Sequence, residues 1–357
     1  MKAIIAAGGK GTRLRPLTFS SNKHLLPIAN KPLLLYPVEA IAETGIHEVG
    51  IIVNETRPAV EALLGTGSKW GLKFTYINQP EPLGLAHVVK ISQDFLGQSP
   101  FVYHLGDNIF SAGIMRPFNH FIKEKPDALL TIVKHPENFR LGVPYFDPQG
   151  RLIKVVEKPP QPPNPYGVPG LYFFNPKVFS AFEGKHAIQP SARGELEITD
   201  LYNFMLDQGY QVDTEEIDGI WLDPGKFNDM LEANQLMLAR LDDRDIKGQV
   251  NASTKLTGVV IVGKDSQIIK SQIIGPVHIS TGVTVKNSTI GPHVSIDRNC
   301  TIANCVIKNS IIMEQSTLKD IDTPIVDSLI GKNTHVWGEH QQSVSLFIGD
   351  HCTIRLS

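Results

Sequence analysis

Residues 257–357 carry aliphatic side chains at intervals of six, in short trains separated by turn residues. The trains are Val262, Ile268 and Ile274, then Ile290, Ile296 and Ile302, then Val306, Ile312 and Leu318. A period of six is typical of a parallel β-helix, in which each flat face takes one short strand per turn. An antiparallel sandwich is the alternative, but its strands have a period of two, which does not explain sustained sixes.

The region before about residue 240 follows a different pattern, in which short β-rich runs alternate with helical ones. The runs are residues 3–7, 48–54, 73–79, 101–107 and 128–135. This alternation predicts a Rossmann-like, mostly parallel sheet covered by helices on both faces. The fold class is therefore α/β followed by a β-helix, with a first domain at 1–241, a linker at 242–256 and a β-helix domain at 257–357.

The first predicted strand runs into a loop rich in glycine and cations, GGKGTRLRPLT (8–18). It fits neither the P-loop pattern nor the dinucleotide fingerprint, because the glycine spacing of both fails. Glycines still allow close backbone approach, and exposed N–H groups bind phosphate oxygens. Arg13 and Lys23 add positive charge, so a triphosphate is the ligand that this loop suits. A surface turn with solvated charges is the alternative.

Amino-acid composition indicates which classes of partner to expect and in which cellular compartment the protein works. The net charge is −2, which gives no electrostatic reason to expect nucleic acid or a membrane surface. The three cysteines, Cys300, Cys305 and Cys352, are odd in number and lack metal-ligand spacing, which argues against a disulfide framework or a zinc site. No apolar run is long enough for a signal peptide or a membrane span. We expect a soluble, cytoplasmic protein.

Several motifs, in order along the first 240 residues, strongly resemble those of the sugar-1-phosphate nucleotidylyltransferases. They are the opening loop (8–18), KHLLP (23–27), KPL (31–33), QPEPLGLA (79–86), LGDN (105–108) and VEKP (156–159). RGELEITD (193–200) and WLDPG (221–225) match the glucose-1-phosphate thymidylyltransferases in particular. The tail is similar to the long form of that family, which ends in a left-handed β-helix. The first domain would then be the nucleotidyltransferase catalytic domain.

The resemblance implies a reaction of dTTP with glucose 1-phosphate that yields dTDP-glucose and pyrophosphate. The attacking phosphate oxygen is already an anion, so the protein must mainly bring two anions together and neutralise charge. Arg13 and Lys23 are the expected catalytic cations. Asp107 and Asp223 would hold Mg²⁺, which typically takes one or two carboxylates together with substrate phosphates. Pro224 stands where family members usually carry threonine, which puts a hydroxyl contact there in doubt.

The resemblance also assigns binding residues. The nucleotide would be bound by Gly8, Gly9, Gly11, Thr12, Arg13, Gln79 and Gly84, and the sugar phosphate by Gly142, Glu157, Lys158 and Glu195. Adjacent residues of an ideal strand point to opposite faces, so Glu157 and Lys158 can meet one ligand only if the strand ends there. Pro159 indicates that it does.

Several alternatives stay open on the sequence. The nucleotide could be UTP, because neither the loop nor Gln79 distinguishes UTP from dTTP. ATP- and GTP-using relatives fit the QPEPLGLA segment less well. A catalytically inactive regulatory subunit is another class, although such proteins typically lose residues equivalent to Arg13, Lys23, Asp107, Lys158 or Asp223. The tail could be an acyltransferase, but no histidine in it has a catalytic setting. We expect the tail to be a structural module that supports homo-oligomerisation.

Overall fold

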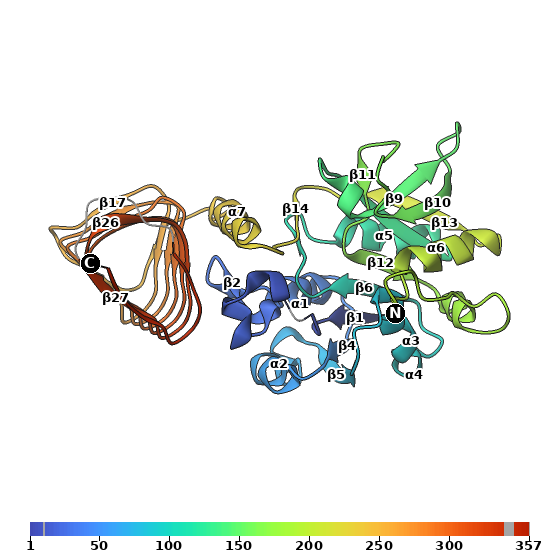
Figure 1. Ribbon diagram of the computed structural model, residues 1–357, viewed down its shortest axis with the longest axis horizontal. Helices are drawn as coiled ribbons and strands as arrows, with labels where there is room; N and C mark the ends of the chain where they lie inside the picture. The colour runs from blue at the N-terminus through green and yellow to red at the C-terminus, as the bar shows by residue number, and fades with distance from the viewer. Residues whose placement is uncertain (10, 339–345, 357) are drawn as a thin grey trace. The chain divides into compact units, whose positions relative to one another are not determined.

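The computed structural model describes residues 1–9, 11–338 and 346–356 (Figure 1). Contacts divide the chain into two compact units. The first comprises Met1–Gly9 and Leu34–Trp221, and the second comprises Lys10–Leu33 and Leu222–Ser357. The expected α/β architecture with a C-terminal parallel β-helix is confirmed. The predicted domain limits stay a prediction, and the first β-helix strands, β15 (Asp245–Ile246) and β16 (Gln249–Val250), fall within the segment predicted as a linker.

The first unit is built on an eight-stranded sheet in the order β11-β8-β12-β6-β1-β4-β5, with β13 beside β8. Its parallel part comprises β1 (Lys2–Ala6), β4 (Glu48–Val53), β5 (Lys73–Asn78) and β6 (Phe101–Leu105). The remainder comprises β8 (Ala128–Lys134), β11 (Tyr166–Gly167), β12 (Leu171–Phe174) and β13 (Val212–Glu216). β12 is antiparallel to both of its neighbours, and β13 is parallel to β8.

Helices cover both faces of this sheet, because its central strands are apolar on both sides. On β1, Ile4 belongs to one hydrophobic core, whereas Ala3 and Ile5 belong to the other. The first core is covered by α3 (Leu85–Ile91), α4 (Gln93–Leu96) and α6 (Ile198–Asp207). The second is covered by α1 (Leu35–Glu43), α2 (Arg57–Leu64) and α5 (Met115–Glu124). A separate antiparallel hairpin of β9 (Gly142–Phe146) and β10 (Leu152–Glu157) also belongs to this unit.

The second unit contains the N-terminal loop, an α-helix and the β-helix. The loop forms three short 3-10 turns, Thr12–Leu14, Leu17–Phe19 and Lys23–Leu25, and then a hairpin of β2 (Pro27–Ile28) and β3 (Lys31–Pro32). The helix is α7 (Phe227–Leu238). The β-helix runs through β29 (Thr353–Leu356), with stacked coils that Figure 1 shows in orange and red.

Successive coils of the β-helix pair in parallel, as in β18 (Val260–Val262), β21 (Val277–Ile279) and β24 (Val294–Ile296). Paired residues such as Val260 and Val277 are 17 apart, so a strict period of six slips by one residue per coil. Two members of the six-residue trains lie off the interior for this reason. Ile274 and Val306 are only partly buried, and their neighbours Ile273 and Ile307 are fully buried instead.

No helix among residues 1–9, 11–338 and 346–356 combines the length and the apolar character that a membrane crossing requires.

Candidate active site

The carboxyl ends of β1, β4, β5 and β6 meet at one edge of the sheet in the first unit. From β1 the chain continues to β4 and β5 on one side of the sheet. It then returns to β6 on the other side of β1, so the strand order reverses at this point. Open α/β sheets bind ligands at such a switch point. Gly8 follows β1, Asn54 follows β4, Gln79 follows β5 and Asp107 follows β6. The Asn54 amide donates a hydrogen bond to the Gly8 carbonyl oxygen and so holds the start of the glycine loop, where Gly9 is exposed.

The segment predicted to read the base is held by contacts within its own unit. The Gln79 side-chain amide nitrogen lies 3.1 Å from His87 Nδ1 on α3. Burial, with a further contribution from Lys90, lowers the pKa of His87, which favours the neutral ring that can accept this hydrogen bond. Gly84 has φ 103°, and a Cβ there would lie 2.4 Å from the Leu196 carbonyl oxygen. Glycine at 84 is therefore required by packing alone, whatever its role toward a nucleotide.

Asp107 is held by a buried amide beside it. Asn108 donates to Asp107 Oδ1 at 3.0 Å, while its own Oδ1 accepts from the Gly170 backbone N–H at 3.1 Å and from Trp221 Nε1 at 2.7 Å. A Cβ on Gly170 would lie 2.4 Å from the Asn108 oxygen, so this arrangement needs a glycine there. Asn108 thus fixes Asp107 to the strand beside it and sets the position of the Trp221 indole.

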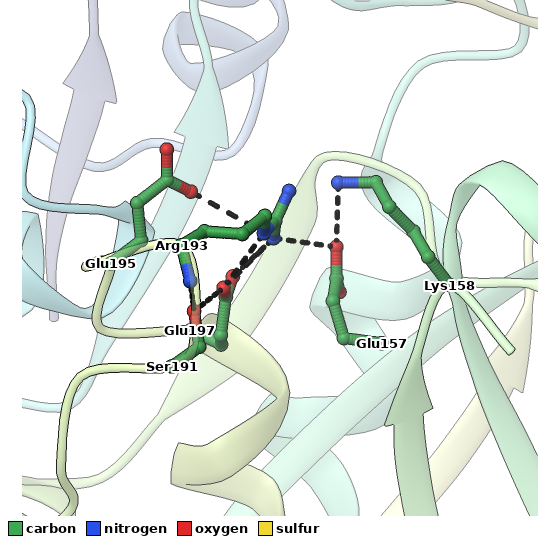
Figure 2. Close-up of polar contacts among 6 residues, drawn as sticks. All are labelled: Glu157, Lys158, Ser191, Arg193, Glu195 and Glu197. Atoms are coloured by element: carbon green, nitrogen blue, oxygen red, sulfur yellow. Dashed lines mark hydrogen bonds and ion pairs between the residues drawn. The ribbon is translucent and has the colours of Figure 1, made fainter.

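Glu157 and Lys158, the predicted sugar-phosphate pair, do turn to the same side (Figure 2). Glu157 is the last residue of β10, and Lys158 has φ 45°, which breaks the alternation of the strand. Lys158 Nζ consequently lies 2.9 Å from Glu157 Oε1. Gly142 pairs with Glu157 across the hairpin, and a Cβ at 142 would lie 3.5 Å from Glu157 Oε2 and 2.8 Å from Thr199 Cγ2.

Arg193 lies at the centre of the acidic side chains around this pair (Figure 2). Its Nη2 lies 2.8 Å from both oxygens of Glu197, 3.3 Å from Glu157 Oε1 and 3.7 Å from Glu195 Oε2. Glu197 is buried and also accepts from Ser191 Oγ at 2.7 Å. Burial, together with the charges of Glu197 and Glu157, raises the pKa of the nearby Asp200. The excess of carboxylates suits a ligand that offers hydroxyl donors.

The N-terminal loop in the second unit gathers the two predicted catalytic cations. Gly11 adopts φ 59°, and a Cβ there would lie 2.8 Å from Lys23 Cβ, so the backbone packs directly on that lysine. Lys23 is buried, and its Nζ lies 3.5 Å from Asp223 Oδ1. Thr12 and Arg13 are exposed on the first 3-10 turn. The guanidinium of Arg13 lies over Gly225, where a Cβ would be 3.0 Å from Nη2.

Sequence reasoning missed several residues that support these groups. Asn54, His87, Asn108 and Arg193 are each hydrogen-bonded or ion-paired to a predicted site residue, and Glu197 pairs with Arg193. Asn108 and Arg193 lie inside motifs quoted above, so proximity in the chain was an available signal. Asn54 could have been found as the polar residue that ends a buried strand next to β1.

A glycine loop after the central strand, cationic side chains and strand-end carboxylates define an α/β enzyme that handles phosphorylated ligands. A family model described as nucleotidyl transferase matches residues 2–240, and one described as GMPPB C-terminal domain matches residues 273–355. The chain belongs to the nucleotidyl transferase family. The expected enzyme class and the resemblance on which it rested are confirmed.

Similar proteins agree with this membership. The chain is 41% identical to a glucose-1-phosphate thymidylyltransferase of Streptomyces antibioticus, over 100% of this chain and 99% of the relative. It is 39% identical to one of Streptomyces griseus over the full length of both. A Bacillus anthracis crystal structure, assigned as a glucose-1-phosphate thymidylyltransferase and determined with a sucrose, matches at 36% identity. Its TM-score is 0.62, over 69% of this chain and 97% of that one.

Proposed function

We propose that the chain transfers a thymidylyl group from dTTP to glucose 1-phosphate, releasing pyrophosphate. The observation that carries the proposal is the Glu157–Lys158 pair at the end of β10, in a chain 41% identical over its length to a glucose-1-phosphate thymidylyltransferase. A carboxylate accepts from hydroxyls, and an ammonium meets a phosphate, so the pair suits the two ends of a sugar phosphate. Glu195 and Gly142 flank it.

In this reaction a phosphate oxygen of glucose 1-phosphate attacks the α-phosphorus of dTTP, and the bond to pyrophosphate breaks. The nucleophile is an anion, so no general base is needed. Arg13 presents a planar guanidinium that can hold phosphate oxygens while pyrophosphate departs. Lys23 supplies a second cation, and Gly8, Gly9, Gly11 and Thr12 offer backbone donors. Gln79, oriented by His87, and Gly84 are proposed to meet the base.

A magnesium ion would add charge neutralisation when bound, and Asp107 and Asp223 are the carboxylates that we propose to hold it. The donor set suits this ion. Among the residues that the structure describes, no group of three or more His, Cys, Asp or Glu could hold a metal. Mg²⁺ needs no such cluster, because it keeps waters and takes substrate phosphates. Asn108 fixes one of the two carboxylates in place.

Pyrophosphate release from glucose 1-phosphate and Mg²⁺, measured in parallel with dTTP, UTP, CTP, ATP and GTP, tests the proposal. Release that is fastest with dTTP supports it. Release that is fastest with UTP would replace it by a uridylyltransferase. No release with any nucleotide, alongside measurable binding of sugar nucleotide, would replace it by the non-catalytic subunit.

The role of Arg13 has a matched control on the same loop. Arg13→Ala should lower kcat by roughly 100-fold or more, as loss of a charge-stabilising donor typically does. Arg15 is also exposed, but its guanidinium stacks on the Phe19 ring at 4.9 Å. Arg15→Ala should therefore leave turnover within about twofold. Equal effects of the two substitutions would remove Arg13 from the catalytic role.

We also propose a cytoplasmic homo-oligomer that assembles through the β-helix. Trp337 on β27 (His335–Gly338) is 41% exposed near the end of the helix, where apolar surface is available for a contact. A native mass that is a multiple of 39.4 kDa would support assembly, and a monomer at micromolar concentration would contradict it.

A further inference from the structure

The N-terminal loop that carries Arg13 and Lys23 makes specific polar contacts with the β-helix of its own unit. The contacts lie at two places, around residues 16–21 and at residues 29–30. We call residues 11–33 the cation segment. Lys23 lies between the two places of contact along the chain, and Arg13 lies just before the first.

The first contact is at the C-terminal end of the β-helix. Asp350 Oδ2 accepts from Ser20 Oγ at 2.7 Å and from Ser21 Oγ at 3.0 Å. Its other oxygen accepts from the Lys332 backbone N–H at 2.8 Å, which ties the carboxylate to the neighbouring coil. A Cβ on Gly349 would lie 3.3 Å from Pro16 Cβ, so the backbone at 349 also packs on the segment.

The second contact holds the turn between β2 and β3. The Asn30 amide donates to the carbonyl oxygens of His278 and Ile296, both at 2.9 Å. These carbonyls belong to successive coils, since β21 pairs with β24. One side chain is thus fixed against two coils at once.

The backbone of Ala29 is held from two further sides. His278 Nδ1 lies 3.0 Å from the Ala29 carbonyl oxygen. The Ala29 N–H donates to Asn234 Oδ1 at 2.9 Å, and this buried oxygen also accepts from Ser295 Oγ at 2.9 Å. Every one of these partners belongs to α7 or to the β-helix.

The turn itself needs such support. Ala29 and Asn30 have φ values of 49° and 62°, the left-handed region at both central positions of a two-residue hairpin turn. An alanine there costs about 1 kcal/mol or more relative to glycine, so the conformation persists only where the surroundings hold it. The β-helix supplies those surroundings together with Asn234 of α7.

We infer that the β-helix positions the cation segment, so that it serves catalysis as well as assembly. Asn30, Asn234, His278 and Asp350 are positioning residues that act through Arg13 and Lys23. This inference rests on the proposed function, because it requires those two cations to act on the phosphates.

Asn30→Asp tests it in the full chain. The variant keeps the side-chain size but turns a carboxylate toward two carbonyl oxygens. The matched control is Asn287→Asp, since Asn287 also has a left-handed φ of 50° and donates from its side chain, but to Asn304 on the β-helix itself. We expect kcat to fall about tenfold or more with Asn30→Asp, with the KM for glucose 1-phosphate within about twofold, and no change with Asn287→Asp. Equal kcat values for the two variants would overturn the inference.

A second, milder variant tests the inference without a large disturbance of the fold. Ser20→Ala with Ser21→Ala removes only surface hydroxyls and leaves the Asp350–Lys332 bond in place. We expect a smaller fall in kcat, of about threefold, and faster amide hydrogen exchange over residues 17–26, with unchanged exchange in the first unit. Unchanged exchange over that stretch in both this variant and Asn30→Asp would contradict the inference without reference to activity.

A double-mutant comparison separates positioning from mere stability. If Asn30 acts through Arg13, then Asn30→Asp should lower kcat much less in the Arg13→Ala background than in the native chain. The same comparison is made in a Lys23→Ala background, and an undiminished fold-loss in both the Arg13→Ala and the Lys23→Ala backgrounds would overturn the positioning role. A native chain without turnover, or Arg13→Ala with full turnover, would instead indicate that the proposed function is wrong.

Discussion

The Lys158 ammonium lies 2.9 Å from the carboxylate of Glu157, the residue immediately before it. Neighbours in a strand cannot meet in this way, and here they do because Lys158 leaves the strand with φ 45°. The two charged groups therefore lie on the same side of the chain, where we propose that one ligand meets both, and each charge can be removed separately.

Lys158→Ala should raise the KM for glucose 1-phosphate. Loss of one charge-assisted hydrogen bond to phosphate costs about 1.5–3 kcal/mol, which is roughly 10- to 100-fold in affinity. The control is Lys154→Ala on the same strand, because Lys154 is exposed and lies over the Tyr145 ring at 4.6 Å. Steady-state kinetics with varied glucose 1-phosphate measures both variants, and the KM of the control should stay at the native value.

Arg193→Met should destabilise the first unit. Glu197 is buried and would keep only Ser191 as a side-chain partner among the described residues, so the variant should lose about 1–3 kcal/mol of unfolding free energy. Arg140→Met is the control, since the Arg140–Glu137 pair is exposed and such pairs contribute less than about 1 kcal/mol. Urea unfolding measures the loss of unfolding free energy in both variants. Similar losses would show that Glu197 does not need Arg193 as a partner for the stability of the fold.

Gly84→Ala should cost far more stability than Gly97→Ala. Both glycines have positive φ, 103° and 57°, so alanine carries a conformational cost of about 1–3 kcal/mol at each. Only at Gly84 would the new Cβ also overlap the Leu196 backbone, because Gly97 has open space around it. Thermal unfolding should show at least twice the loss in Tm for Gly84→Ala. A difference within error would mean that the backbone at 196 moves freely.

His120 should make stability depend on pH. Its ring nitrogens lie 2.5 Å from Glu215 and 3.1 Å from Asp213, and Arg116 shares Glu215. Burial opposes the charged ring, but hydrogen bonds from Asp213 and Glu215 and their charges outweigh it and raise the pKa of His120 above 6.5. The charged ring therefore stabilises the fold fully below pH 6.5, and this contribution is lost as the pH rises through the raised pKa.

The measurement is the unfolding free energy of the native chain minus that of His120→Gln, from about pH 5.5 to 9. The difference should be largest at the acidic end and shrink as the pH rises. The control is Asn119→Gln, which replaces the exposed neighbour of His120 and changes no titratable group, so its difference should stay flat. If the difference in unfolding free energy between the native chain and His120→Gln instead grew with pH, the pKa of His120 would be lowered in the folded chain rather than raised.

Sequence patterns predicted much of the fold, but they did not specify the register, which packing decides. The trains of six predicted the β-helix, yet Ile273 and Ile307 occupy the interior rather than Ile274 and Val306. Paired residues of successive coils are 17 apart at these places, whereas three intervals of six span 18 residues. A pattern counted in sixes therefore falls one residue out of step with the structure. The strand runs of the first unit were easier to predict, because buried parallel strands are apolar on both sides.

The amino-acid sequence by itself determined the two architectures, the family and the residue types of the candidate site. Periodicity and ordered motifs are local along the chain, and local patterns can be read without a structure. Only the tertiary structure decided which groups hold those residues: Arg193 among three glutamates, Asn108 on Asp107, and Asn30 and Asp350 on the cation segment. Asn30 meets His278 across 248 positions of sequence, and Ser20 meets Asp350 across 330. Such partners are chosen by the packing of the folded chain, because no local preference of either residue specifies the other.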